Sequence, residues 1–310
     1  MNTPLLLIVF NRPVLTQQVF EKICNMKPSK LYIAGDGPRE GFENENEKVK
    51  KVRKIVTDIN WSCEVKTLFS DYNLGCKKAC IKAIDWFFEN EEKGIILEDD
   101  CLPHPDFFNF CENLLETYND EEKVSFISGT NFQNNNYRGD ASYYFSKYVH
   151  IWGWATWKKS WKKYNVGDIE FWPKWCETSD FKSKLPNKVE RKYWKNIFNK
   201  IYLNKIDTWD YPLTCSVLHK GGLTAIPNVN LIKNIGFGDD ATHTKFKDNL
   251  SSNMKVGKIG HIIHPQTIQR NIEADLWTFN HHYGGRNMRF PYRFIFYFKK
   301  LINQILKKIK

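Results

Sequence analysis

The chain has 310 residues, of which 42% are hydrophobic and 26% charged, a composition typical of a globular rather than a disordered protein. No apolar run is long enough for a membrane span or a signal peptide, and the eight cysteines include no CxxC pair, which favours reduced thiols over zinc or disulfides. The net charge is +11, but residues 286–310 hold eight Lys or Arg and no acid, so the remainder is at only +3. We therefore assign the basicity to a terminal segment and not to a groove, which argues against nucleic-acid binding.

The first hundred residues alternate short apolar runs with amphipathic segments. The runs predict strands at residues 5–10, 31–34, 64–69 and 94–97, and the segments between them predict helices at 15–25, 43–59 and 76–90. This order, with its short connections, predicts an α/β fold in which helices cover both faces of a mainly parallel sheet. Neither GxGxxG after the first strand nor GxxxxGK[ST] occurs, so a dinucleotide-binding domain and a P-loop are not expected.

A helix at 107–118 and a strand at 124–127 follow, and then the composition changes. Eight of the eleven tryptophans lie between Trp152 and Trp209. Aromatic faces beside polar groups suit sugar binding, because the C–H faces of a sugar ring stack on indole. Most of these tryptophans are nevertheless expected to be packing residues, and Trp209, which precedes Asp210, is the one that we assign to the site.

The acidic triplet Glu98-Asp99-Asp100 directly follows the apolar run 94–97. In open α/β sheets, ligands bind at the carboxyl ends of the strands. Three adjacent carboxylates repel one another unless a cation or hydrogen-bond donors offset their charge, and hard oxygen ligands suit Mg²⁺ or Mn²⁺. The alternative is a solvated acidic turn before the next helix. The fully apolar strand before the triplet and the proline-marked helix start after it favour the metal site.

The segment 95–108 resembles the metal-binding segment of nucleotide-sugar glycosyltransferases of the GT-A (Rossmann-like) fold. It is most similar to the N-acetylglucosaminyltransferase I group, in which an EDD variant of the DxD motif precedes a Pro-Asp-Phe-Phe helix start. Segments 6–13, 33–37, 151–154 and 208–211 resemble the same family in the same order. Five ordered matches are more specific than any single motif, although residues 133–147 and those after 245 match nothing in the family.

The resemblance implies one GT-A domain with two halves. Residues 1–101 would form the nucleotide-sugar and metal-binding half. Residues 102–285 would form the aromatic-rich, acceptor-binding and catalytic half. Residues 286–310 lie outside the resemblance, and their own composition predicts a basic amphipathic helix.

The resemblance also implies roles for single residues of the donor site. Asp100 would be the direct ligand of Mn²⁺ or Mg²⁺, and Glu98 and Asp99 would contact the ribose or the donor sugar. Asp36 would reach the uracil or the ribose, and Arg12 would hold base or phosphate oxygens. A plain turn aspartate and a surface arginine are the respective alternatives for Asp36 and Arg12.

Asp210 matches the family's general base, whose attack on the face opposite the leaving group implies inversion. The alternative is an aspartate that caps the helix beginning near Pro212. The sequence Trp209-Asp210-Tyr211-Pro212 differs from the family's Trp-Asp-Asp-Trp and lacks its second acid. This difference affects expected acceptor contacts more than the base itself.

The polar, glycine-bearing segment 234–243 lies where the family has a loop that orders over the bound donor. Thr242 and His243 could donate hydrogen bonds to phosphate oxygens. Asp239-Asp240 as a second metal site is the weaker alternative.

We therefore expect a cytoplasmic, metal-dependent, inverting glycosyltransferase for hexosyl or N-acetylhexosaminyl transfer. It would use a UDP-sugar and a glycan or lipid-linked acceptor, in bacterial surface polysaccharide synthesis, because the chain lacks the family's membrane stem. A sugar-nucleotide nucleotidyltransferase would share the acidic site but needs a Gly-rich, basic signature where this chain has Asn11-Arg12-Pro13. A non-enzymatic nucleic-acid- or membrane-binding protein is the third alternative.

In residues 293–310, apolar side chains recur every three or four residues between lysines. The pattern predicts an amphipathic helix with one apolar and one cationic face. Such a helix could dock on the catalytic domain or on a second subunit. It could also lie on the anionic inner membrane, near a lipid-linked acceptor.

Overall fold

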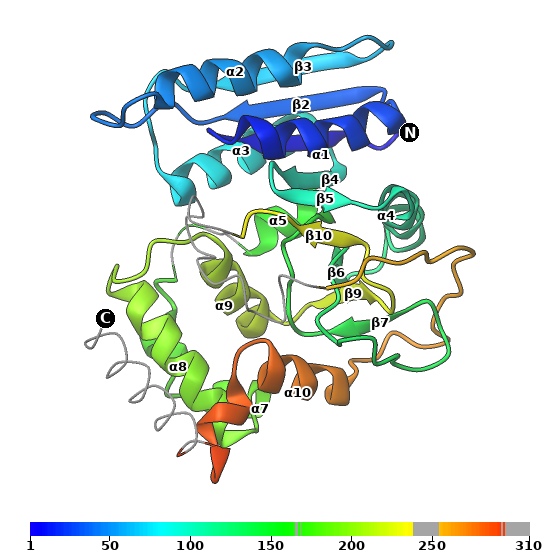
Figure 1. Ribbon diagram of the computed structural model, residues 1–310. Helices are drawn as coiled ribbons and strands as arrows, with labels where there is room; N and C mark the ends of the chain where they lie inside the picture. The colour runs from blue at the N-terminus through cyan, green and yellow to red at the C-terminus, as the bar shows by residue number, and fades with distance from the viewer. Residues whose placement is uncertain (165–166, 168, 238–253, 293, 295–310) are drawn as a thin grey trace.

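The computed structural model describes residues 1–164, 167, 169–237, 254–292 and 294. Its centre is an eight-stranded sheet. The strands are β1 (Leu5–Val9), β2 (Lys30–Gly35), β3 (Glu64–Phe69), β4 (Lys93–Glu98), β6 (Val124–Ser128), β7 (Tyr143–Ser146), β8 (Trp154–Trp157) and β9 (Leu223–Pro227). Their order across the sheet is β3-β2-β1-β4-β8-β6-β9-β7 (Figure 1).

The first half of the chain has the predicted architecture. β1 pairs in parallel with β2 and β4, and β2 pairs in parallel with β3. Helices α1 (Pro13–Met26), α2 (Glu45–Thr57) and α3 (Cys76–Asn90) connect these strands. Successive side chains of a strand point to opposite faces of the sheet. Accordingly, Leu5 and Leu7 belong to one core cluster with α1 and α2, whereas Leu6 belongs to a second cluster with α3.

The second half adds antiparallel strands that the sequence did not predict. β8 lies between β4 and β6 and is antiparallel to both, β9 is parallel to β6, and β7 is antiparallel to β9. The single sheet thus continues past residue 101. Helix α4 (Pro105–Thr117) begins at the predicted proline, where His104 Nδ1 accepts a hydrogen bond of 3.1 Å from the backbone N–H of Asp106.

The other helices of the second half are α5 (Lys158–Tyr164), α6 (Trp172–Trp175), α7 (Ser179–Lys184), α8 (Lys188–Tyr202), α9 (Asp210–Lys220), α10 (Ile272–His281) and the 3₁₀ helix η1 (Gly285–Met288). Of these, α7, α8 and α10 lie at the end of the molecule opposite β3 (Figure 1), whereas α5 and α9 pack in the core cluster that contains α3. Seven of the eight tryptophans between Trp152 and Trp209 are at most 4% exposed, which confirms that most of them are packing residues. Trp172 and Trp194 anchor the core cluster between α6, α7, α8 and α9.

All eight cysteines are free thiols, and five of them are buried. In the described part of the chain, no helix is both long and apolar enough to cross a membrane. The predicted amphipathic helix at 293–310 lies outside the described residues, apart from Phe294.

Two histidines pack on Phe132 inside the second half. The ring centroids of Phe132 and His282 are 3.7 Å apart and the rings are stacked, and the His150 ring meets Phe132 edge-on at 4.6 Å. Burial lowers the pKa of His282 to about 4. Burial, with the charge of His282, lowers the pKa of His150 well below its usual value.

We expect folding stability to fall as the pH drops below the ordinary histidine pKa of about 6.5, because the unfolded chain takes up protons that the folded chain refuses. Above about pH 6.5, His282 is neutral in both the folded and the unfolded chain, and the folded protein has its full stability. As the pH falls from 6.5 towards about 4, the pKa of His282 in the folded protein, this stability is progressively lost. Between about pH 7 and pH 5, the free energy of unfolding in urea should fall by roughly 2 kcal/mol more in the wild type than in His282→Phe. Equal falls in the two proteins would mean that His282 is not held neutral.

Candidate active site

The acidic triplet lies at the carboxyl end of the central parallel strands. Glu98, the last residue of β4, is level with Ile8 near the end of β1. Because β1 and β4 run parallel, the loop after β1 and the triplet meet at one edge of the sheet. This is the position at which sequence reasoning placed the site.

Arg12 connects the two aspartates of the triplet. Its Nη2 lies 2.7 Å from Asp99 Oδ1, and its Nη1 lies 2.9 Å from Asp100 Oδ2. The backbone N–H of Phe10 donates a hydrogen bond of 3.1 Å to Asp99 Oδ2. Arg12 is the residue before helix α1, and Pro13 at the first helical position fixes where the chain turns. The guanidinium that was predicted to hold base or phosphate oxygens is therefore engaged with the acids.

The triplet carries more negative charge than Arg12 offsets. Burial raises the pKa of Glu98 well above its usual value, and the charge of Asp100 adds to the effect. Burial also raises the pKa of Asp99, to about 6, although Arg12 opposes the shift. Within the described ranges, the Glu98 carboxylate forms no ion pair and accepts no hydrogen bond.

This donor set fits a hard divalent cation that a bound substrate helps to coordinate. Among the described residues, no group of three or more His, Cys, Asp or Glu side chains could hold a metal ion by itself. One carboxylate completed by substrate oxygens and water is, however, ordinary for Mg²⁺. Asp100 Oδ2 accepts a hydrogen bond from Arg12, whereas Oδ1 receives, from the part of the chain that the structure describes, only a long contact of 3.4 Å from the Cys101 thiol. Oδ1 is thus the oxygen that could bind a cation.

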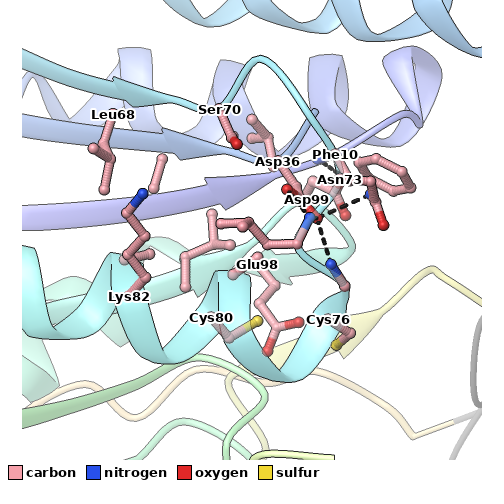
Figure 2. A pocket seen from close by; sticks show the side chains of 18 of the residues that line it. Phe10, Asp36, Leu68, Ser70, Asn73, Cys76, Cys80, Lys82, Glu98 and Asp99 are labelled. Atoms are coloured by element: carbon pink, nitrogen blue, oxygen red, sulfur yellow. Dashed lines mark hydrogen bonds between the residues drawn. The ribbon is translucent and has the colours of Figure 1, made fainter. Parts of the chain in front are cut away.

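A cavity of about 330 Å³ opens between the ends of β1 and β2 and helix α3 (Figure 2). This volume is in the usual range for a site that holds a small ligand. Its wall is mainly apolar, and its polar side chains include Asp36, Asn73 and Lys82. Figure 2 shows the Glu98 side chain beside Cys76 of α3, at the end of the cavity nearest the triplet. We refer to this space as the first cavity.

Asp36 lines the first cavity, but its carboxylate oxygens already accept hydrogen bonds from other groups of the protein. Its oxygens accept hydrogen bonds from the backbone N–H of Leu74 at 2.9 Å, the backbone N–H of Gly75 at 3.1 Å and Asn73 Nδ2 at 2.9 Å. Asp36 therefore ties the loop after β2 to the loop before α3. The neighbouring Gly37 is required there, because a Cβ atom would lie 2.5 Å from the Tyr72 backbone. Sequence reasoning missed Asn73, whose place beside this turn depends on the fold.

A second cavity, of about 340 Å³, adjoins the first and shares Arg12, Cys76 and Glu98 with it. Both Asp100 and Asp210 line this second cavity. Two acids that are 110 positions apart in the sequence thus face one space.

Asp210 is the first residue of α9, and the Thr208 hydroxyl donates a hydrogen bond to its Oδ1. Trp209 lines the cavity, but its side chain is only 3% exposed and stacks on Trp154 at a ring-centroid distance of 5.9 Å. Trp152 is more exposed and also lines the second cavity. Trp152 belongs to segment 151–154, and the resemblance of this segment to the glycosyltransferase family is the feature of the sequence that could have identified Trp152 as a site residue.

A short two-stranded sheet holds the loop after the triplet in place. β10 (Ile232–Asn234) is antiparallel to β5 (Cys101–Pro103), and the N–H of Ile235 donates to the Asp100 carbonyl at 2.8 Å. Gly236 packs against the ion pair: a Cβ atom there would lie 2.2 Å from Asp100 Oδ2 and 2.9 Å from Arg12 Nη1. The predicted lid residues Thr242 and His243, and the pair Asp239-Asp240, lie outside the described residues.

No protein-family model matches the chain, and no curated protein matches it in sequence. Solved structures resemble it weakly. HddC from Yersinia pseudotuberculosis is 9% identical over 51% of this chain and 77% of its own, with a TM-score of 0.31. A cytidylyltransferase from Leptospira borgpetersenii serovar Hardjo-bovis is 10% identical over 54% and 65%, with a TM-score of 0.33.

The glycosyltransferase GlyE in Streptococcus pneumoniae TIGR4 is 10% identical over 72% of this chain and 45% of its own, with a TM-score of 0.33. At these TM-scores the likenesses carry no argument about function. The resemblance to the N-acetylglucosaminyltransferase I group stays a prediction.

Proposed function

We propose that the protein is a metal-dependent, inverting glycosyltransferase that uses a nucleotide diphosphate sugar, with UDP as the nucleotide. The observation that carries the proposal is the pair of adjoining cavities. The first is a mainly apolar space that suits a nucleoside, and the second places Asp100 and Asp210 around one volume. A donor that spans both cavities would bring its diphosphate past the triplet.

On this proposal, the triplet and Arg12 position the leaving group. Asp100 Oδ1 would hold Mn²⁺ or Mg²⁺, which when bound offsets charge on the diphosphate. Arg12 keeps Asp100 in one orientation through its other oxygen, at 2.9 Å. Glu98 and Asp99 would contact ribose or sugar hydroxyls, and Asp36 would act on the nucleoside through the loop that it holds.

Asp210 would act as the general base. The acceptor hydroxyl gives its proton to the Asp210 carboxylate as its oxygen bonds to the anomeric carbon. The bond from that carbon to the diphosphate oxygen breaks in the same step, so the nucleoside diphosphate leaves and the configuration inverts. Thr208 supports this role because its hydroxyl donates a hydrogen bond to Asp210 Oδ1 and so helps to orient the carboxylate. Trp209 and Trp152 would border the sugar.

A thermal-shift screen of nucleotide sugars, with and without Mn²⁺, tests the proposal. We expect the melting temperature to rise with one group of nucleotide sugars, and to rise further when Mn²⁺ is present, since binding to the folded state alone stabilises it. Free nucleoside triphosphates with sugar 1-phosphates form the comparison arm. A shift in that arm alone would favour a nucleotidyltransferase.

Gly236→Ala should disturb the site without unfolding the protein. The added methyl group would overlap Asp100 Oδ2 and press on Arg12 Nη1, so the ion pair must move. We expect metal-dependent donor binding, measured by calorimetry, to weaken by roughly tenfold or more, because a displacement of about 1 Å is costly in a positioned site. Gly167→Ala is the matched control, because a Cβ atom there meets nothing within 4 Å. Unchanged donor binding in Gly236→Ala would mean that Asp100 does not hold the donor.

The proposed acceptor is a glycan or a lipid-linked sugar at the inner face of a bacterial membrane. Residues 293–310 are proposed to lie on that surface as an amphipathic helix. Full-length protein should float with anionic liposomes more strongly than a chain truncated after Asn287. Equal flotation of the two would remove the membrane role of the tail.

A further inference from the structure

A third cavity lies away from the triplet, between α8 on one side and the segment that carries α6 and α7 on the other. Its volume is about 410 Å³. Among the described residues, it shares no lining residue with the first or second cavity. We call it the α8 groove, and it is lined by Cys176, Glu177, Phe181, Lys182, Lys188, Arg191, Lys192, Lys195, Asn196 and Asn199.

Five cationic side chains converge on the α8 groove. Four of them, Lys188, Arg191, Lys192 and Lys195, follow the i, i+3, i+4, i+7 spacing that places residues on one helix face. Lys182 of α7 adds the fifth from the opposite wall. The other face of α8 is fixed in the core, where Trp194 is fully buried. The cations are therefore held on one side of a firmly packed helix.

Little of this charge is neutralised within the protein. Glu177 is the only acid among the described residues of the lining, and its carboxylate pairs with Lys195 at 2.7 Å. Among the residues that the structure describes, the side-chain ammonium groups of Lys182, Lys188 and Lys192 form no ion pair and no hydrogen bond. Unpaired cations in a concave surface attract anions more strongly than the same charges on a convex one, because the wall excludes solvent.

Two further groups of the groove, on Arg191 and Asn199, are oriented as donors. Arg191 Nη1 donates to the Leu185 carbonyl at 2.8 Å, which holds the guanidinium in place. Asn199 Oδ1 accepts a hydrogen bond of 2.8 Å from the Trp172 indole, so its amide nitrogen is the group left for a ligand. A lining of ammonium, guanidinium and amide donors suits a ligand that only accepts hydrogen bonds. Phosphate oxygens have that property.

The small net charge of residues 1–285, only +3, concealed this groove. Residues 172–202 contain eight Lys or Arg and three acids, a surplus of five positive charges. The interpretation that the basicity belongs only to the terminal segment is therefore wrong. The helical spacing of the four α8 cations was the signal in the sequence that could have revealed it.

We propose that the α8 groove binds a phosphate-bearing group of about diphosphate size, separate from the donor diphosphate. The proposal does not depend on the proposed glycosyl transfer, because the groove and the acidic site share no residue. The two sites are nevertheless neighbours. Trp194 of α8 contacts Tyr211, next to Asp210, at a ring-centroid distance of 6.1 Å. A ligand held in the groove would therefore lie about one helix diameter, roughly 10 Å, from that contact.

Calorimetry with inorganic pyrophosphate tests the groove. The titration is done in EDTA, to suppress metal-dependent binding at the triplet, and at two salt concentrations. The groove variant Lys188→Gln/Arg191→Gln/Lys192→Gln is compared with the control Lys48→Gln/Lys51→Gln/Lys54→Gln. The control removes the same charge from the exposed face of α2. Both sets of side chains lie at the surface, and circular dichroism and melting temperature verify that each variant is folded.

We expect saturable binding to the wild type that weakens as salt rises, roughly tenfold weaker binding to the groove variant and nearly unchanged binding to the control. Equal losses in the two variants, or no saturable binding to the wild type, would overturn the proposal. A second arm replaces pyrophosphate with vesicles of phosphatidic acid in phosphatidylcholine. A selective loss in the groove variant there identifies a lipid headgroup as the source of the phosphate. A loss confined to the pyrophosphate arm identifies a soluble ligand.

Discussion

Replacing Asp100 with alanine is expected to abolish sugar transfer and to remove the effect of Mn²⁺ on nucleotide binding. Asp100 lines the second cavity together with Glu98, and among the described residues its Oδ1 receives only the weak thiol contact of Cys101. Without this carboxylate, the charge on the leaving diphosphate would lose its main stabilisation, the kind of interaction worth about 10²–10³ or more in rate. Transfer is measured as release of nucleoside diphosphate, and binding by calorimetry with and without Mn²⁺.

The variant should remain folded, because Arg12 keeps its 2.7 Å ion pair with Asp99. Asp120→Ala, which removes an exposed acid beyond α4, is the matched control and should behave as wild type. Near-normal transfer by Asp100→Ala, or an unchanged response to Mn²⁺, would show that the metal assignment is wrong.

Asp210→Asn is expected to keep its affinity for the donor and to lose about 10²–10⁴-fold in kcat, the usual contribution of a general base. Asparagine preserves the shape of the side chain and its contact with Thr208 but cannot take a proton from a hydroxyl. A protonated base cannot accept the proton of the acceptor hydroxyl, so kcat/KM of the wild type should fall at low pH. This fall should be absent in Asp210→Asn. Donor affinity is measured separately, by calorimetry with a nucleotide sugar.

Asp106→Asn is a matched control, because Asp106 also lies in the first turn of a helix, α4, and faces neither cavity. It should lose little activity. If Asp210→Asn lost donor affinity as strongly as rate, Asp210 would be a donor-site or structural residue instead of the base.

The first half of the fold could be predicted because its pattern is local. Each parallel strand is a short apolar run, and each connection is a helix of adequate length, so the order of elements nearly fixes the topology. Leu5 to Val9 are nearly all fully buried, as expected for a strand with helices on both faces. The rule that ligands bind at the carboxyl ends of parallel strands then predicted a site at the triplet, and the structure places the triplet at that edge of the sheet.

The second half depends on pairings that no local pattern encodes. β8 is inserted between β4 and β6, far from β4 in the sequence, and its residues Trp154–Trp157 read equally well as part of a packed aromatic segment. The short β5–β10 pair is only three residues long on each side, yet it fixes the backbone of Asp100. Such short strands are recognised only once their partners are known.

The candidate site was predictable as a set of residues but not as a set of contacts. The acids of the triplet were identified from their charge after a buried strand. The partner of Arg12 could not be read from the sequence, because the loop after β1 and the triplet are brought together only by strand pairing. For the same reason the engagement of Asp36 with Asn73 was not foreseen.

The most direct test of the account is ³¹P NMR of the protein incubated with nucleotide sugars and Mn²⁺, first alone and then with added pyrophosphate. For the proposed glycosyltransferase we expect one nucleotide sugar to be converted to its nucleoside diphosphate, slowly with water as acceptor, and we expect Asp100→Ala to abolish this signal. Formation of a nucleoside triphosphate and a sugar 1-phosphate, only when pyrophosphate is present, would contradict it and identify a nucleotidyltransferase.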